Sequence, residues 1–432
     1  MNFGIREWMI GTLAALDAIV AGTAARAGAP EALYNFKGGS DGAFPVGNLV
    51  ADAAGNLFGV TLDGGISDRG VIFELSPPAT QSGSWTEAVI YRFQGGADGQ
   101  YPEGGLTIDS NGKIYGTTSG GGCLPDCDGF GYGTVFEITA PTGGSKNWAF
   151  STIYRFQPKA GAQDGAGPEA ALTFDTSGNL YGTTITGGLH FNGYGVVFKL
   201  APPPSGSGLW TETLLHVFSG YSEGVRPLAG VTFDGAGNLF GTTTEGGLFG
   251  RCCGTVFELS PTKSGPWTDT ILHRFNGRDG RGPGSDLVFD GSNNLFGAVS
   301  GGQGNGSICA DGCGATFELT PPLGGVGDWS EQTIFRFPGG TAASNPGVVL
   351  FQNGILYGVA RSFQPFSQGT LFVLSPSGRK FWNIVVTPFA GDEGAGPASL
   401  VTDPPVSGAT TLYGVASKGG STGRGTVFSW TP

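Results

Sequence analysis

The chain has 432 residues, of which 82 are glycine, and its formal net charge at pH 7 is −12. Charged residues make up only 13% and aromatic residues 12%, which excludes a disordered chain because the aromatic side chains supply ample apolar surface to bury. The acidic balance disfavours nucleic acid and anionic membrane surfaces as partners.

Residues 1–27 are typical of a secretory signal peptide. Arg6 precedes an apolar run from Met9 to Ala21, and small residues at Ala25 and Ala27 suit a cleavage site. Cleavage would leave residues 28–432 as a single domain, which we expect to be secreted or periplasmic. An uncleaved membrane anchor is the alternative interpretation. No other run approaches the ~18 apolar residues that a membrane-spanning helix needs.

One pattern recurs along the rest of the chain, and Ala171–Leu200 shows it most clearly. Three strands are predicted inside it, at Leu172–Asp175, Asn179–Thr184 and Gly195–Leu200, because these pieces are apolar or β-branched and too short for helices. The residues from Asp175 to Asn179 suit a tight hairpin with an Asx turn and a glycine at positive φ.

Three anchors of this pattern each occur seven times. A strand ends in phenylalanine at Phe36, Phe93, Phe156, Phe218, Phe275, Phe337 and Phe389. An aromatic residue precedes glycine at Phe58, Tyr115, Tyr181, Phe240, Phe296, Tyr357 and Tyr413. A strand similar to "GTVFEL" begins at Gly70, Gly133, Gly195, Gly254, Gly314, Gly369 and Gly425. The phenylalanine anchors lie 57, 63, 62, 57, 62 and 52 residues apart.

This period fits four short strands per unit and is too long for leucine-rich or hexapeptide solenoids. Seven such units predict an all-β fold, a seven-bladed β-propeller of four-stranded blades. Each blade would run from a nearly uncharged inner strand, through the aromatic-glycine and "GTVFEL" strands, to an outer strand led by tryptophan. A glycine-rich β-solenoid is the alternative.

The ends of the chain complement each other. The last unit, Pro397–Trp430, lacks an outer strand, whereas Glu31–Phe36 is an outer strand without a unit. Closing the ring with both ends of the chain leaves no open ring, which is the usual answer of propellers to the problem of unpaired edges. The sequence therefore predicts that the N-terminal strand completes the last blade.

The motif "GNLYGTT…GG…GTVFEL" followed by a tryptophan strand resembles the GloVer tandem repeats of bacterial secreted and surface proteins. The resemblance covers Glu31–Trp430. It implies a repeat-built extracellular protein and transfers no catalytic residue. The chain stops at Pro432 without a terminal apolar anchor, which favours release or periplasmic residence over surface attachment.

Acidic residues follow the outer strand in six of the seven units. They are Asp41, Asp98, Asp164, Glu223, Asp279 and Glu393. In a propeller, these loops share a face with the loops between the second and third strands, around the mouth of the channel. Such carboxylates would hold a hydroxylated ligand or a hard cation, of which calcium is the one we consider, and no other cofactor is expected. Alternatively, each acid only accepts hydrogen bonds from its own turn.

Aromatic residues on the same loops, Tyr101 among them, suit a glycan-binding face or else pack over neighbouring loops. His190 lies in a loop of this face and joins Tyr101 among the ligand-binding candidates. His216 and His273 stand where two other outer strands carry tyrosine, so we interpret them as packing substitutes.

All six cysteines fall between second and third strands, and an even count favours disulfides in a secreted chain. The predicted bridges join Cys123 to Cys127, Cys309 to Cys313 and, as a strained vicinal pair, Cys252 to Cys253. Bridges between the fourth and fifth units, or a metal site made by their four cysteines, are alternatives.

Together these features predict a monomeric secreted binding protein whose ligand, a glycan or another extracellular protein, meets the loops around the channel. One alternative is a polysaccharide hydrolase or lyase on the same face, with paired acids as proton donor and base. Another is a structural cell-surface protein. The chain has three histidines and no His-Glu-x-x-His motif, which counts against catalysis, and we assign no catalytic residue.

Overall fold

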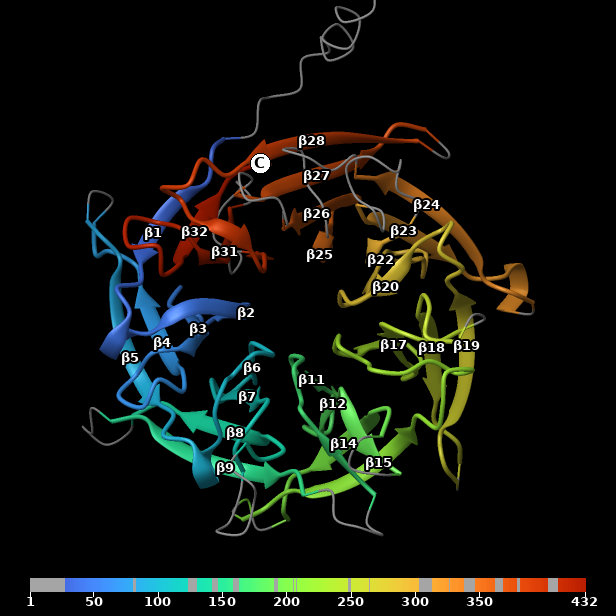
Figure 1. Cartoon of the computed structure of the whole chain (residues 1–432), viewed down its shortest axis with the longest axis horizontal. Helices are drawn as coiled ribbons and strands as arrows, with labels where there is room; N and C mark the ends of the chain where they lie inside the picture. Colours follow the sequence, from blue (N-terminus) through green and yellow to red (C-terminus); the bar gives the residue numbers. More distant parts are fainter. Residues whose placement is uncertain are drawn as a thin grey trace, which may run out of the picture.

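The computed structural model describes residues 28–80, 83–122, 130–141, 147–157, 163–189, 193–204, 206, 208–247, 250–263, 265–302, 313–325, 327–337, 346–361, 368–378, 381–402 and 411–432. Its sheets form a ring of seven blades, each with four antiparallel strands (Figure 1). The predicted seven-bladed β-propeller is confirmed, and the solenoid alternative is wrong. The predicted signal peptide lies outside the described residues.

The first four blades have the following strands, given from the inner to the outer strand. Blade one holds β2 (Ala43–Ala51), β3 (Leu57–Asp63), β4 (Val71–Ser76) and β5 (Thr86–Arg92). Blade two holds β6 (Leu106–Ile108), β7 (Ile114–Thr118), β8 (Thr134–Thr139) and β9 (Ala149–Arg155). Blade three holds β11 (Thr173–Phe174), β12 (Leu180–Thr184), β14 (Val196–Ala201) and β15 (Thr211–Val217), beside a small sheet of β10 (Asp164–Ala166) and β13 (Thr186–Gly188). Blade four holds β16 (Thr232–Phe233), β17 (Leu239–Thr243), β18 (Thr255–Ser260) and β19 (Thr268–Arg274).

The last three blades keep this order. Blade five holds β21 (Val288–Phe289), β22 (Leu295–Gly301), β23 (Ala315–Thr320) and β24 (Ser330–Arg336), and β20 (Arg281–Pro283) also pairs with β22. Blade six holds β25 (Pro346–Gln352), β26 (Ile355–Ala360), β27 (Thr370–Pro376) and β28 (Trp382–Pro388). Blade seven holds β30 (Val401–Thr402), β31 (Leu412–Lys418), β32 (Thr426–Trp430) and β1 (Glu31–Asn35), and β29 (Ala395–Pro397) also pairs with β31.

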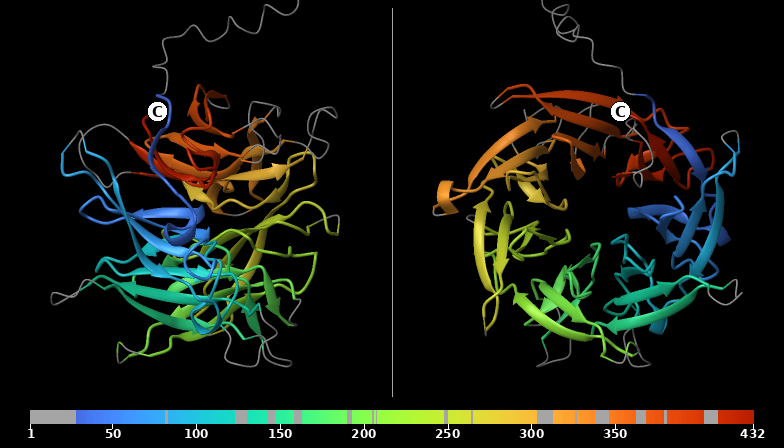
Figure 2. Two further views of the ribbon diagram at one scale, coloured as in Figure 1. Left: turned by 60° about the vertical axis from the view of Figure 1, so that its left-hand side comes forward. Right: turned by 180° about the vertical axis from the view of Figure 1, so that it is seen from behind.

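The strands run outward in the predicted order. The first strand of each blade, such as β2 or β25, borders the central opening, and the fourth, such as β5 or β28, lies at the rim (Figure 1). Seen from other directions, the blades stand around the opening as a closed ring (Figure 2). No helix among the described residues is long and apolar enough to cross a membrane.

The N-terminal strand completes the last blade, as predicted. Strand β1 pairs antiparallel with β32, with Asn35 opposite Thr426 and Ala32 opposite Phe428. The backbone N–H of Phe36 then donates to the carbonyl oxygen of Gly425 at 3.0 Å. The two ends of the chain are therefore held in one sheet, and the ring has no unpaired strand at its seam.

The phenylalanine anchors join neighbouring blades. Each packs against the phenylalanine in the third strand of the next blade, with ring centroids 5.0 to 5.5 Å apart. The pairs are Phe36–Phe73, Phe93–Phe136, Phe156–Phe198, Phe218–Phe257, Phe275–Phe317, Phe337–Phe372 and Phe389–Phe428. These mostly edge-on contacts make the core a continuous ring of aromatic residues between the blades.

The glycine after each second-strand aromatic leaves room for this ring. A Cβ atom on Gly59 would lie 2.5 Å from Cζ of Phe73, and one on Gly182 would lie 2.7 Å from Cζ of Phe198. Carbon atoms cannot approach so closely, so the sequence requires glycine here. The predicted hairpin is also present, because Asp175 accepts a backbone hydrogen bond from Asn179 at 2.9 Å.

Candidate functional site

The six predicted loop acids occupy equivalent places where one blade passes to the next. Each accepts a hydrogen bond from the backbone N–H that follows a phenylalanine anchor. The pairs, donor first, are Lys37 and Asp41, Gln94 and Asp98, Gln157 and Asp164, Ser219 and Glu223, Asn276 and Asp279, and Ala390 and Glu393. These bonds close the turn between blades, which is the structural role considered for them. Ligand binding by these acids stays a prediction.

Five of these acids, all but Glu393, also meet a tyrosine or histidine of the outer strand that precedes their loop. The hydroxyl group of Tyr34 donates to Asp41 at 2.9 Å, and that of Tyr91 donates to Asp98 at 3.0 Å. The central cavity described below is lined by other residues. The structure therefore distributes these acids among the blade boundaries and does not gather them around one point.

A second acid, on the outer strand of the following blade, joins four of these boundaries. These outer-strand acids are Glu87, Glu212, Asp269 and Glu331, and sequence reasoning missed them. Burial, followed by the charge of Asp41, raises the pKa of Glu87 to about 7. Burial, followed by the charge of Asp164, raises the pKa of Glu212 to about 8. Their sequence signal was positional, because each stands the same number of residues before the phenylalanine anchor of its unit.

At two adjacent boundaries a histidine takes the place of tyrosine and meets both acids. The first histidine cluster comprises His216, Glu223 and Asp269. The second histidine cluster comprises His273, Asp279 and Glu331. In each cluster, one nitrogen or oxygen atom from every residue lies within 4.8 Å of the others.

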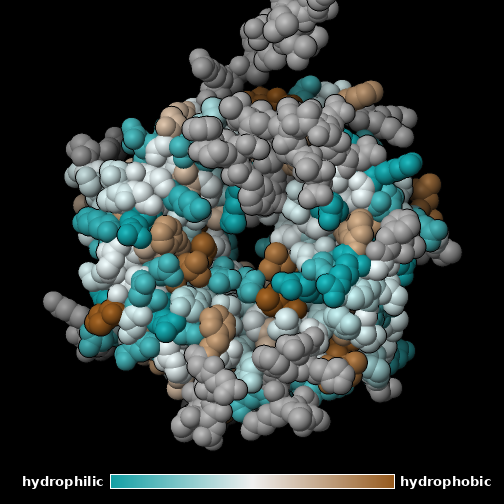
Figure 3. Space-filling model, viewed as in Figure 1, coloured by the Kyte–Doolittle hydropathy of each residue, from teal (hydrophilic) through white to brown (hydrophobic). Residues whose placement is uncertain are grey.

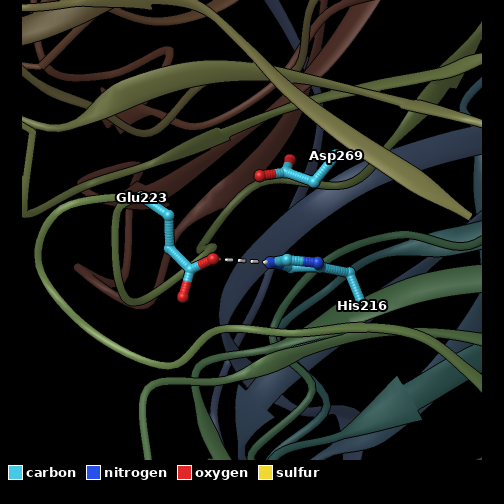
Figure 4. A group of neighbouring side chains, drawn as sticks. All are labelled: His216, Glu223 and Asp269. Carbon is cyan, nitrogen blue, oxygen red and sulfur yellow. Dashed lines mark ion pairs between the residues drawn. The ribbon is translucent and has the colours of Figure 1, made fainter.

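Figure 4 shows how three separate elements build the first histidine cluster. His216 lies on β15 of blade three, Glu223 on the following loop and Asp269 on β19 of blade four. His216 Nε2 is 3.4 Å from Glu223 Oε2, and these side chains are 14% and 21% exposed. The ring of His216 also packs edge-on against Phe218 at 4.6 Å, so the predicted packing role is present beside the polar one.

A cavity of about 630 Å³ lies at the centre of the propeller and is lined by all of its blades. Each blade contributes at least one residue to the lining. In order from blade one to blade seven, examples are Val46, Glu103, Glu169, Leu228, Asp286, Arg361 and Ser399. In the space-filling view, hydrophilic and hydrophobic residues both border the central opening (Figure 3). The cavity therefore offers ionisable groups beside apolar surface.

Glu103 and Glu169 occupy equivalent positions, each directly after the proline that opens the inner strand. Burial raises the pKa of Glu103 above its ordinary value. Burial, followed by the charge of Glu103, raises the pKa of Glu169 to about 7, against a smaller opposing effect of Arg226. Glu169 can therefore hold or release a proton near neutral pH, beside a second carboxyl group.

Two further charged residues complete the cavity lining. Arg361 is exposed to the cavity, and its Nε donates to the carbonyl oxygen of Pro397 at 3.4 Å. Asp286 is also exposed there, and its Oδ1 accepts a hydrogen bond from the backbone N–H of Gly230 at 2.8 Å. Asp286 thus ties blade five to blade four, while Arg361 brings a positive charge to the wall of the cavity.

Sequence reasoning missed Glu103 and Glu169. Their signal was present, because the residue after the opening proline varies among the blades and is acidic only in blades two and three. Residues shared by all units of a repeat serve the scaffold, so a residue that differs between units is a better candidate for a ligand site.

The predicted aromatic candidate Tyr101 packs among neighbouring loops. Its ring lies 5.8 Å from that of Phe130, and the guanidinium carbon of Arg69 is 5.3 Å from its centre. Phe130 is 58% exposed, so one face of this stack remains open to solvent. The other predicted candidate in these loops, His190, lies outside the described residues.

The cysteine predictions are largely outside the described residues. Cys252 and Cys253 have Cα atoms 3.6 Å apart and sulfur atoms in contact, and their vicinal bridge stays a prediction. The bridge from Cys123 to Cys127 lies wholly outside the described residues. Cys309, the predicted partner of Cys313, also lies outside the described residues. The side chain of Cys313 itself is described and is buried.

Solved structures with similar folds share little sequence with this chain. An ulvan lyase, described as a new family of polysaccharide lyase bound to -[GlcA(1-4)Rha3S]-, has a TM-score of 0.51 and 10% identity over 92% of this chain and 95% of its own. A protein of unknown function from Dyadobacter fermentans has a TM-score of 0.44 and 10% identity over 94% and 98%. An oxidoreductase (glucose dehydrogenase) from Thermus thermophilus has a TM-score of 0.41 and 14% identity over 93% and 99%. At 10% identity, the likeness to the ulvan lyase shows the fold alone.

No curated protein matches the chain by sequence. A family model, described as the Gloeobacter/Verrucomicrobia repeat, matches residues 11–156 and 88–310. These ranges contain the aromatic-glycine and "GTVFEL" strands of blades one to four. The chain therefore belongs to the Gloeobacter/Verrucomicrobia repeat family, in agreement with the resemblance seen in its sequence.

Proposed function

We propose that this protein is a secreted glycan-binding propeller whose ligand enters the central cavity. The observation that carries the proposal is that Glu103, Glu169 and Arg361 all line one cavity of about 630 Å³. Cavities of roughly 300 to 1,000 Å³ are the usual size of small-ligand sites. Secretion rests on the signal-like residues 1–27.

The chemistry of the cavity wall suits a sugar better than an apolar ligand. A protonated carboxyl group donates one hydrogen bond and accepts others, as does a sugar hydroxyl group. Ser399 supplies a further hydroxyl group, whose oxygen is buried and makes no hydrogen bond with the described residues. Leu228 and Val46 supply apolar surface for the face of a sugar ring.

Arg361 favours a glycan that carries carboxylate or sulfate groups. Arginine binds such groups through two parallel hydrogen bonds, and its guanidinium group keeps its positive charge at any physiological pH. The ulvan lyase shows that a propeller of similar fold can bind a polysaccharide. That likeness supports the proposal only as an example of what the architecture can hold.

A glycan array with neutral, carboxylated and sulfated oligosaccharides tests the proposal. We expect binding to acidic members, at least tenfold weaker binding by the Glu169→Gln and Arg361→Met variants, and no change for Glu137→Gln. Glu137 is a suitable control because it pairs with Lys113 at 2.8 Å on the third strand of blade two, outside the cavity lining. Binding that survives in both cavity variants would contradict the proposal.

The same cavity supports a second candidate, an enzyme that cleaves acidic polysaccharides. Glu169, with a pKa of about 7, could remove or deliver a proton near neutral pH, and Glu103 could serve as its partner. Lyase activity would appear as an unsaturated product and hydrolase activity as new reducing ends. Turnover that the Glu169→Gln variant abolishes, with binding retained, would establish the enzyme.

A further inference from the structure

We propose that the two histidine clusters each bind a divalent transition-metal ion, for which zinc is the probe. The clusters lie at adjacent blade boundaries, between blades three and four and between blades four and five. They are separate from the central cavity, whose lining includes none of their residues. The inference is thus independent of the proposed glycan binding.

The spacing in the first histidine cluster fits metal ligands. The 3.4 Å between His216 Nε2 and Glu223 Oε2 is longer than an ordinary N–H···O hydrogen bond of about 2.7 to 3.2 Å. Two ligands held about 2.1 Å from one tetrahedral zinc ion stand roughly 3.4 Å apart. The third ligand, from Asp269, also falls within the 4.8 Å that contains all three atoms.

Two polar atoms of the first histidine cluster have unmet bonding capacity. His216 Nε2 and Asp269 Oδ1 are both shielded from solvent, and neither makes a hydrogen bond with any residue in the described part of the chain. A buried polar atom without a partner destabilises the fold, and coordination to a cation would satisfy both atoms. This observation is distinct from the mere proximity of the acids.

The carboxylates are held in place by hydrogen bonds from neighbouring residues. Glu223 Oε1 accepts hydrogen bonds from the backbone and side chain of Ser219, which leaves Oε2 directed at His216. In the second histidine cluster, Asn276 fixes both oxygens of Asp279: its backbone N–H donates to Oδ1 at 2.9 Å and its side-chain amide to Oδ2 at 2.7 Å, while Oδ2 lies 3.1 Å from His273 Nε2. Such supporting bonds orient metal ligands before the ion arrives.

The donor set selects the class of ion. One imidazole and two carboxylates suit zinc and its neighbours, whereas calcium and magnesium take oxygen ligands throughout. Three protein ligands leave a position for water. The positive charges of Arg274 and Arg336 act on Asp269 and Glu331 respectively, so each site presents less than the full charge of its two carboxylates.

The neighbouring boundary between blades two and three provides a natural control. There Tyr154 stands in place of histidine, and its hydroxyl group donates to Glu212 Oε2 at 2.9 Å. The phenol proton occupies the space that a metal would need, and tyrosine offers no imidazole lone pair. The scaffold thus accepts tyrosine at this position, which makes histidine-to-tyrosine variants a conservative test.

The test is zinc stoichiometry on the full chain, stripped with a chelator and dialysed against zinc chloride. We expect two ions per chain in the unaltered protein, one in His216→Tyr or His273→Tyr, and none in the double variant. Cobalt bound in place of zinc should give a visible ligand-field absorption band. The intensity of this band should fall in the same variants and in the same proportion as the zinc content. His216→Gln and His273→Gln replace the tyrosine variants if those do not fold.

Two results would overturn the proposal. One is an unaltered chain that takes up no zinc or cobalt at neutral pH. The other is a double variant that retains the full zinc content, since the ions would then be held by the cysteines or by His190.

Discussion

The indole Nε1 of Trp430 donates a hydrogen bond to the carbonyl oxygen of Gly28 at 3.0 Å, across 402 positions of the chain. Strand β1 begins three residues after Gly28 and pairs with the strand that contains Trp430. A chain that begins at Gly38 would lose this pairing and the burial of Leu33, Tyr34 and Phe36. Each side chain contributes roughly 1.5 to 3 kcal/mol when fully buried, so we expect several kcal/mol of destabilisation, measured by chemical denaturation. A chain that begins at Gly28 is the control, and equal midpoints would contradict the closure.

Gly59→Ala should destabilise the protein by about 1 to 3 kcal/mol, because its Cβ would overlap the Phe73 ring and Leu49. Gly235→Ala is the matched control, since no atom lies within 4 Å of its added Cβ. We expect the control to stay within about 0.5 kcal/mol of the unaltered chain. Thermal unfolding of both variants, measured alongside the unaltered chain, tests this prediction. A similar loss of stability in the two variants would contradict the packing explanation.

Stability should fall as the pH rises from about 4.5 to about 7, and Glu169 should contribute to that fall. The folded protein keeps the Glu169 proton up to a pKa of about 7, whereas the unfolded chain releases it near 4.5. Between these values the folded state binds more protons, so raising the pH reduces its stability. After allowance for solvent screening, the effect is about 1 to 2 kcal/mol.

The Glu169→Gln variant tests this pH dependence because it removes the titrating group and keeps the shape. Denaturation midpoints measured at pH 5 and pH 8 should differ less in the variant than in the unaltered protein. An unchanged difference would mean that Glu169 titrates at its ordinary pKa. Glu87 and Glu212, whose pKa values burial also raises, should leave a residual fall in the variant.

Asp98→Ala should destabilise the fold without weakening glycan binding. The substitution removes the acceptor for the Gln94 backbone N–H and for the Tyr91 hydroxyl group, and each lost bond costs about 0.5 to 1.5 kcal/mol. Asp98→Asn should lose less, because its amide oxygen still accepts the backbone bond. If glycan binding fell in both variants at full folding, the loop acids would be part of the binding site after all.

Much of the fold could be predicted from sequence because its rules are local and repeated. Gly59 and its counterparts, the phenylalanine anchors and the Asx turns each follow from a few adjacent residues. Even closure by β1 could be predicted, because an outer strand without a blade faced a blade without an outer strand. Because the units repeat, the long-range pairing of β1 could be predicted by counting the strands in each unit.

The candidate sites could not be predicted in the same way, because their residues meet only across blades. Glu103 and Glu169 affect each other's protonation because the inner strands of two blades converge on one cavity. His216 was placed at the correct packing position, yet Asp269 reaches it from the outer strand of the next blade. Burial sets the pKa values, and burial depends on the closed ring.

The seam between β1 and β32 also fixes the order of events during synthesis. Asn35 accepts a hydrogen bond from Ser421, and 386 positions separate the two residues. The first strand made is therefore the last to find its partner, and it must stay unpaired while every other blade is assembled. Long loops are slow to close, so the nascent chain carries an exposed strand edge for most of its folding. A circular permutant that places β1 directly after β32 would remove this delay and leave the ring of blades unchanged.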